Sequence, residues 1–266
     1  MSRFLPLLPS PPRVNVLRLQ GSIAAGGRSL SDRGLAQVIH RAFTKGRPAA
    51  VAIEVNSPGG SPVQSSLIAA RIRRMAEEKQ VPVHAFIEDV AASGGYWLAS
   101  AADRIWVDPG SIIGSIGVIS SGFGLQDLIA RMGVERRIHT AGASKSQRDP
   151  FLPEREEDIA RLRVMLDGLH EGFIAQIRDR RGLRLTDDPA LFTGEYWLGP
   201  RAIELGLADG IGHLVPKMKE IFGPKTRFRR FGRKRGLVAR LGGAVTDHAL
   251  GAIEERAMFA RYGLLP

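Results

Sequence analysis

A serine stands beside two glycines where an apolar segment gives way to a helical pattern. Ser93, Gly94 and Gly95 follow the segment VHAFIEDVAA, and Gly59 and Gly60 follow VAIEVNSP in the same manner. Main-chain N–H groups at a turn that opens a helix have no partner within the helix, so they can donate to a ligand. Two such turns on neighbouring strands could bind an oxyanion, and glycine lets a substrate carbonyl approach the backbone closely.

The Ser93 hydroxyl is a poor nucleophile unless a neighbouring base removes its proton. None of the six histidines lies in a setting typical of a catalytic triad, and there is no G-x-S-x-G motif. A lysine serves as a base only where burial lowers its pKa, because an exposed amine with a pKa of about 10.4 is protonated at neutral pH. Lys145 lies among small residues in HTAGASKSQRDPF, with no acid before Asp149, so it is the candidate base.

Each of these residues also has a structural interpretation. Ser93 could cap the helix that follows it, and Gly59 and Gly60 could form an ordinary turn between a strand and a helix. Lys145 could be a surface lysine. The aromatic residues Tyr96 and Trp97, next along the chain, are expected to pack in the core behind the turn.

The composition is that of a globular protein. Among 266 residues 44% are apolar and 24% are charged, which suits one medium domain or a domain with an appendage. The absence of cysteine excludes disulfides, a catalytic thiol and thiolate metal sites, and it favours a reducing compartment. No apolar run is long enough to span a membrane, and prolines interrupt the start of the chain, so residues 1–13 are expected to form a flexible arm.

The net charge of +11 is concentrated near the end of the chain. Residues 225–236, KTRFRRFGRKRG, carry seven basic groups and no acid. This segment could be a solvated linker, or a patch attracted to anionic lipid; nucleic-acid binding is disfavoured, because no recognised module accompanies the charge. A last amphipathic helix at about 244–262 could lie on a bilayer or pack on a neighbouring subunit.

Strand patterns alternate with helical patterns along the chain, which predicts the α/β class. We expect an N-terminal arm at 1–13, a globular domain at 14–223, and a basic linker with a C-terminal amphipathic helix at 224–266. The strands are expected at 14–23, 50–60, 81–88, 103–109, 114–120 and 134–142, and the helices at 30–46, 61–79, from Ser93 onward, at 125–133 and at 153–181.

Five motifs together resemble the S49 family of serine peptidases, which includes signal peptide peptidase A and its SohB relatives. They span roughly residues 14–215 in the family's order, and they read NSPGG, ASGGYWLASAADRI, GSIGV, AGASKSQRDPF and FTGEYWLGPRAIELGLADGIG. The resemblance implies a ClpP/crotonase-like fold of stacked strand-strand-helix units. It also implies a ring-forming homo-oligomer that takes peptide substrates and needs no cofactor or metal.

The resemblance assigns roles residue by residue. Ser93 matches the nucleophile, Lys145 the base, and Ser115 in GSIGV the serine that orients the lysine amine. The oxyanion donors match Gly94 and the PGG turn, where Gly59 and Gly60 remain alternatives.

The implied function is an ATP-independent serine endopeptidase with a Ser/Lys dyad. It would hydrolyse extended peptides such as signal-peptide remnants or small protein fragments.

Many relatives carry an N-terminal membrane anchor that this sequence does not show, which weakens the assignment of signal-peptide remnants. We expect a cytoplasmic location, with peripheral contact at the inner membrane face as the alternative. The competing functions are a crotonase-like acyl-CoA enzyme, which would need a carboxylate near the oxyanion site, and a non-catalytic scaffold of the same fold.

Overall fold

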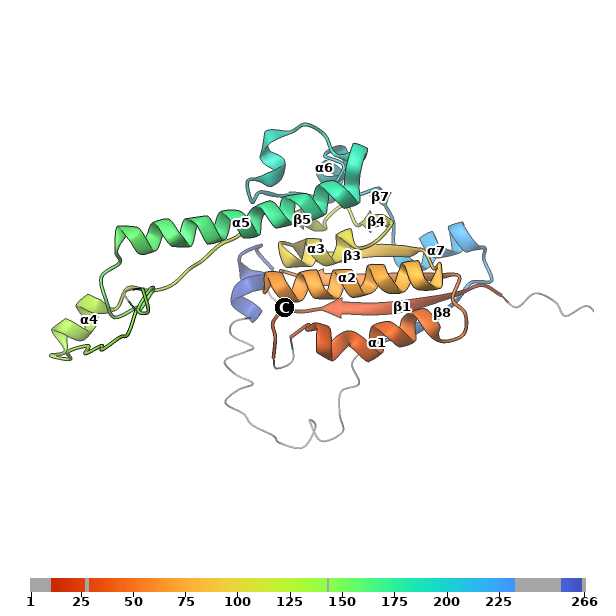
Figure 1. Cartoon of the computed structure of the whole chain (residues 1–266). Coiled ribbons are helices and arrows are strands. Elements are labelled where there is room, and N and C mark those ends of the chain that lie inside the picture. Colours follow the sequence, from red (N-terminus) through yellow and green to blue (C-terminus); the bar gives the residue numbers. More distant parts are fainter. Residues whose placement is uncertain (1–10, 27–28, 143, 233–254, 265–266) are drawn as a thin grey trace, which may run out of the picture.

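A mixed sheet of eight strands forms the centre of the protein (Figure 1). The computed structural model describes residues 11–26, 29–142, 144–232 and 255–264. The strand order is β6-β5-β3-β2-β1-β8, and β4 pairs with β3 and β7; every pairing is parallel except that of β5 with β6. The strands are β1 (Arg13–Gln20), β2 (Ala50–Ser57), β3 (Val83–Ala92), β4 (Arg104–Val107), β5 (Ile112–Gly114), β6 (Tyr196–Leu198), β7 (Gly210–Ile211) and β8 (Arg227–Phe231).

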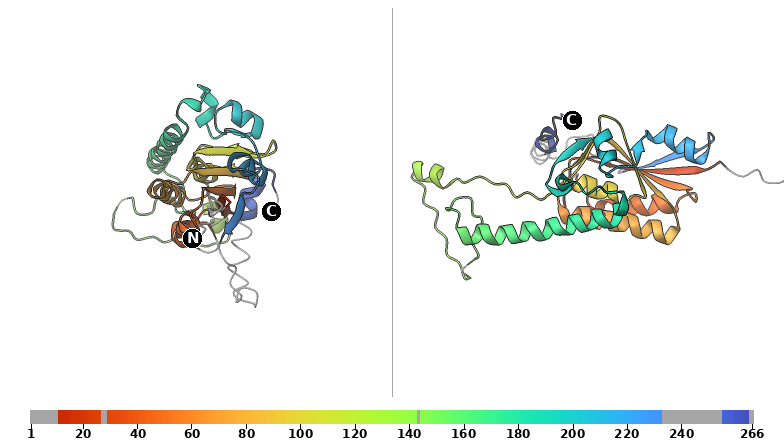
Figure 2. Two further views of the ribbon diagram at one scale, coloured as in Figure 1. Left: turned by 90° about the vertical axis from the view of Figure 1, so that its right-hand side faces the viewer. Right: turned by 90° about the horizontal axis from the view of Figure 1, so that it is seen from above.

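Helices cover both faces of the sheet. The main core lies between the sheet and one helical layer, and a smaller core under α7 lies on the opposite face. Figure 2 shows the two layers on either side of the strands. The main layer contains α1 (Asp32–Thr44), α2 (Pro62–Lys79), α3 (Gly94–Ser100) and the C-terminal part of α5 (Glu156–Arg181); the other helices are α4 (Gln126–Arg131), α6 (Gly199–Glu204), α7 (Leu214–Phe222) and the 3-10 turns Gly182–Arg184 and Pro189–Phe192.

The sequence gives local reasons for these elements. Every residue of β2 is buried, as expected for a near-continuous apolar run in a parallel strand that is covered on both faces. The Ser31 side chain caps α1 by accepting from Gly34 N at 3.3 Å. Pro62 is the first residue of α2, a position whose N–H would have no partner within the helix, so the missing N–H of proline costs nothing there. Gln80 ends the helix in the left-handed conformation.

The predicted α/β class is confirmed, and three predicted elements need correction. Residues 134–142 form no strand, because none of the strands that the structure describes lies beside this exposed segment to pair with it. In place of the strand predicted at 114–120, the structure has β5 at Ile112–Gly114. It ends there because Ser115 turns the backbone, with a φ of 51°. Part of the predicted linker is β8, which pairs with β1 and buries Phe231 in the main core while Phe228 packs on the opposite face. Residues 233–254, which include part of the predicted last helix, lie outside the described residues.

A long arm projects from this compact body. We define the arm as residues 119–168, which include α4 and the first half of α5; Figures 1 and 2 show it extending beyond the sheet. None of the α4 residues is buried, and the apolar contacts of α5 with the main core come from Phe173 and Ile177, beyond the arm. In the described part of the chain, no helix has the length and apolar character needed to cross a membrane.

A buried ion pair joins the end of α5 to the sheet. Arg181 Nη1 donates to Asp209 Oδ2 at 2.9 Å, and the exposed fractions of the two side chains are 2% and 4%. Asp209 Oδ2 also accepts from the main-chain N–H of Ile105 at 2.7 Å. Burial by itself would raise the pKa of the Asp209 carboxyl, but the hydrogen bond and the charge of Arg181 outweigh it, so this pKa lies below its usual range.

We expect Asp209→Asn to lower the free energy of unfolding by about 3–5 kcal/mol at neutral pH, because it leaves Arg181 buried without its opposite charge. The depressed pKa of Asp209 means that its contribution is complete above the unfolded-state pKa of about 3.9 and is lost as the pH falls below it. Urea unfolding of both proteins, measured from neutral to acid pH, should therefore show a difference that narrows below that value. The exposed Asp187→Asn is the control, and a difference that stays constant in acid would contradict the prediction.

Candidate active site

Ser93 occupies a strained turn between β3 and α3. Its φ of 52° and ψ of −124° lie in a region that costs a non-glycine residue on the order of 1–3 kcal/mol. The turn is held by main-chain bonds: Ser93 N donates to Gly114 O at 2.9 Å, and Ser93 O accepts from Tyr96 N at 2.9 Å. The Ser93 hydroxyl has no hydrogen-bond partner among the described residues, although the main chain around it is well bonded.

The helix after this turn is pressed closely against the sheet. A Cβ atom added at Gly95 would lie 2.2 Å from Ser57 O on β2, so only glycine permits this approach. The fully buried Tyr96 donates its hydroxyl to Leu207 O at 2.8 Å. Burial raises the pKa of Tyr96, which keeps this hydroxyl protonated and able to donate. The sequence-based prediction that Tyr96 belongs to the core is confirmed.

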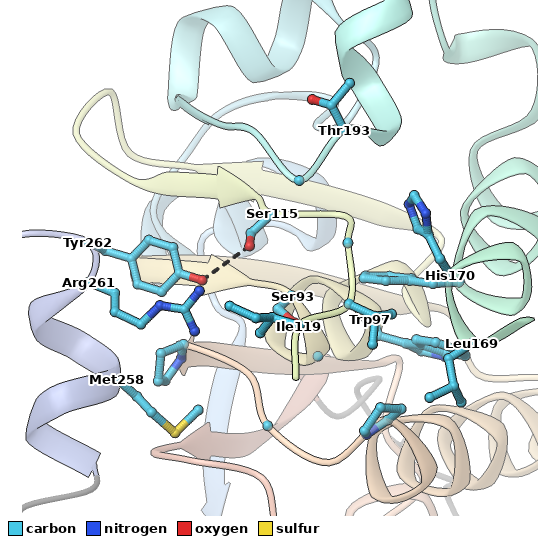
Figure 3. Close-up of a pocket in the computed structure, with 18 residues that line it drawn as sticks. Ser93, Trp97, Ser115, Ile119, Leu169, His170, Thr193, Met258, Arg261 and Tyr262 are labelled. Carbon is cyan, nitrogen blue, oxygen red and sulfur yellow. Dashed lines mark hydrogen bonds between the residues drawn. The ribbon is translucent and has the colours of Figure 1, made fainter. Parts of the chain in front are cut away.

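Parallel pairing brings Ser115 to the same end of the sheet as Ser93. Ala92 of β3 stands opposite Gly114 of β5, so the serine that follows each strand reaches the same region. Ser115 also has a positive φ of 51°, and its N–H donates to Glu195 O at 2.6 Å. Its hydroxyl accepts from the hydroxyl of Tyr262 at 3.3 Å, as Figure 3 shows.

The glycine turns supply two main-chain donors beside Ser93. The N–H groups of Gly60 and Gly94 have no partner among the described residues, and Gly60 N lies 3.3 Å from where a Cβ of Gly94 would be. Gly59 differs, because its N–H donates to Ser57 Oγ at 3.3 Å. A Cβ at Gly59 would lie 2.8 Å from the Cβ of Ser93. The geometry thus makes Gly60 and Gly94 the free donors, and makes Gly59 the residue that leaves space for the serine.

A cavity of about 560 Å³ opens over these groups (Figure 3). Its lining includes Ser93, Gly60, Gly94 and Ser115, together with apolar side chains such as Trp97. No acidic residue lines it among the described residues.

Lys145 lies away from this cavity within one copy of the chain. It is exposed, it belongs to the projecting arm, and it is absent from the residues that line the cavity. Its main-chain N–H donates to Gly142 O at 3.2 Å within a turn. The expectation that its amine is buried is therefore not met in a single copy, whereas Ser93, Ser115, Gly60 and Gly94 are brought together.

Two parts of the cavity were not anticipated from the sequence. His170 of α5 lines it and bonds through Nε2 to Ile116 O at 3.0 Å. The segment 255–264, helical over 255–260, also reaches it and carries Met258, Arg261 and Tyr262. No local pattern could have shown this, because 147 residues separate Tyr262 from Ser115, to which it bonds.

The sequence matches known proteins along most of its length. The model of peptidase family S49 matches residues 75–220. A protein of Brucella melitensis named Na(+)/H(+) antiporter NhaA is 43% identical over 94% of this chain, but the chain spans only 37% of that protein's length. A putative signal peptide peptidase SppA of Enterococcus faecium is 30% identical over 61% of the chain and 47% of its own length. A putative protease of Synechocystis is 30% identical over 74% of the chain and 68% of its own length.

Solved structures of other proteins have a similar fold. A membrane-bound stomatin-specific protease, determined with a substrate peptide, superposes with a TM-score of 0.52 at 14% identity, covering 92% of this chain and 98% of that one. At this identity the likeness shows the fold, and it supports the ClpP/crotonase-like α/β architecture expected from the sequence. The family model covers more than half of the chain, and the Synechocystis protease is 30% identical over 74% of it. The chain therefore belongs to peptidase family S49.

Proposed function

We propose that this protein is a serine peptidase in which Ser93 attacks the scissile carbonyl carbon. The observation that carries the proposal is a hydroxyl in a strained turn, lining a cavity beside the N–H groups of Gly60 and Gly94, where none of the three has a partner among the described residues. In the tetrahedral intermediate these two donors would bind the oxyanion, each contributing roughly 3–4 kcal/mol to the transition state. Substrates would be extended peptides, such as signal-peptide remnants or small protein fragments, and cleavage would need no ATP.

The proposed base is Lys145 of a second copy of the chain. Its amine, neutral once it is covered in the assembly, takes the proton of the Ser93 hydroxyl as the serine oxygen bonds to the carbonyl carbon. The resulting ammonium returns the proton to the leaving amine as the peptide C–N bond breaks, and water then hydrolyses the acyl ester. Ser115, adjacent to Ser93 at the strand ends, would accept from the amine and orient it.

The arm supports this arrangement between copies. It holds Lys145 away from its own body, and its side chains Phe123 and Met132 are 84% and 71% exposed. Val164 of α5 is 72% exposed on the same arm. Apolar side chains gathered on one projection are typical of a surface that another protein covers, and a ring of identical copies would cover each arm in the same way.

The cavity disfavours the two rival functions. A crotonase-like acyl-CoA enzyme would need an acid or base carboxylate near the oxyanion site, and no Asp or Glu is among the described lining residues. A scaffold would not need a strained serine beside unpaired donors, because strain of this kind persists where function uses it. The relative named as a putative signal peptide peptidase supports peptide substrates for this chain.

The first test is complementation between two inactive variants. We expect Ser93→Ala and Lys145→Ala each to abolish peptide cleavage, and Ser93→Ala also to abolish labelling by a fluorophosphonate probe. When the two variants are unfolded, mixed equally and reassembled, about a quarter of the sites combine an intact serine with an intact lysine from a neighbour, so activity should return.

Lys219→Ala, which removes a lysine from α7, is the matched control and should remain active. Full activity of Lys145→Ala would contradict the proposal that Lys145 is the base. No recovery on mixing, with both single variants assembled and inactive, would instead place Lys145 and Ser93 in the same copy.

The second test concerns the space that Gly59 leaves. We expect Gly59→Ala to lose probe labelling of Ser93 and to lower stability by about 1–3 kcal/mol, because the φ of +103° is strained for alanine and the new Cβ meets Ser93. Gly122→Ala, with nothing within 4 Å, is the control. Unfolding in urea and the labelling rate report the two effects, and normal labelling of Gly59→Ala would argue against this geometry.

The third test concerns the arm as an interface. We expect Phe123→Glu to shift the protein toward smaller species in light scattering and to reduce cleavage in parallel, since a charge would be buried where copies meet. Leu183→Glu, on a leucine outside the arm that is even more exposed, should leave both unchanged. An unchanged assembly in Phe123→Glu would show that the arm is not part of the interface.

A further inference from the structure

Arg261 brings a positive charge to the candidate active site. It follows the helical segment 255–260 and lines the same cavity as Ser93. Figure 3 shows its guanidinium directed from that segment toward the space between Tyr262 and Ser93. The cavity therefore has a cationic wall beside the proposed nucleophile.

The charge of Arg261 is not neutralised within the described part of the protein. No ion pair or side-chain hydrogen bond joins its guanidinium to another described residue. Most other arginines of the body have such partners, as Arg181 has Asp209. Since the cavity lining also contains no carboxylate among the described residues, an anionic group entering the cavity would meet Arg261 without competition.

The segment that carries Arg261 is held firmly at this place. Phe259 and Tyr262 are buried against Val90 and Ala92 of β3, and the Tyr262 ring lies edge-on to Tyr196 at 5.1 Å. The bond from Tyr262 to Ser115 ties the neighbouring residue to the catalytic end of the sheet. Packing on both sides of position 261 thus sets where the arginine backbone lies, which a binding residue requires.

We infer that Arg261 is a specificity residue that binds a carboxylate of the peptide substrate. Arginine suits this task because its planar guanidinium donates two parallel hydrogen bonds to a carboxylate. The carboxylate could come from an Asp or Glu side chain near the cleaved bond or from the peptide's own C-terminus. The substrate class is accordingly an extended peptide that is apolar where it meets the cavity wall and anionic where it meets Arg261. This inference rests on the proposed peptidase function.

The test uses matched peptides on the full-length protein. One series carries a single Glu, moved through the positions on either side of the cleaved bond, each paired with the same peptide bearing Gln. A second pair ends in a free carboxylate or in an amide. We expect one pairing to show a kcat/KM on the order of ten- to a hundredfold higher for the anionic peptide, as is typical for a hydrogen bond to a charged group. The series that responds identifies the source of the carboxylate.

We expect Arg261→Gln to bring this ratio close to one, and Arg261→Glu to reverse it. Arg256→Gln, which removes the same charge from an exposed position on the same segment, should preserve the ratio. The preference should also weaken with salt, as expected for a solvent-accessible ion pair.

Two outcomes would overturn the inference: a wild-type protein with no preference in either series, or a preference that survives in Arg261→Gln. Fluorophosphonate labelling of Ser93 separates these outcomes from failure of the peptidase proposal. If the probe labels Arg261→Gln at the wild-type rate, this variant is folded and its nucleophile is intact, so its peptide preference reports on the role of Arg261. If the wild-type protein itself does not label, the peptidase proposal fails.

Discussion

The site depends on one constraint, which is the parallel alignment of β2, β3 and β5. Because the carboxyl ends of parallel strands meet at one edge, the turns that follow these strands converge, and Ala92 stands opposite Gly114. The sharp turn at Ser93 is held on one side by the carbonyl of Gly114, which accepts its N–H, and on the other by α3, which begins at Gly94. Burial of the sheet between two apolar layers offsets the cost of that strained turn.

The four glycines around the serine serve three purposes. Gly59 leaves space for the Cβ of Ser93, Gly95 lets α3 approach β2, and Gly60 and Gly94 present N–H groups that no described residue accepts from. A side chain at any of the four would collide with a neighbouring atom at 2.8 Å or less. The donors are therefore placed before a substrate arrives, so little reorganisation is needed when negative charge develops.

The groups proposed to take part in the reaction lie in two different parts of the fold. The rigid body holds the hydroxyl, the donors and the cationic wall formed by Arg261, whereas the exposed arm holds Lys145. The arm gains few contacts from its own body, since α5 joins the main core only from Phe173 onward. Under the proposed arrangement, a separate copy would lack its base at Ser93, and activity would depend on assembly.

The sequence alone determined the α/β class, most of the helices, and the serine–glycine turns, because these follow from local periodicity and from residues whose conformational limits are intrinsic. It could not show which of Gly59 and Gly60 has its N–H occupied, since that depends on the hydrogen bond from Gly59 N to Ser57 Oγ. It also misassigned the segment that forms β8, because only pairing with β1 and burial of its phenylalanines overcome the charge of its arginines. The place of Arg261 and the exposure of Lys145 were decided by tertiary structure alone, since packing between residues far apart in the chain leaves no local pattern.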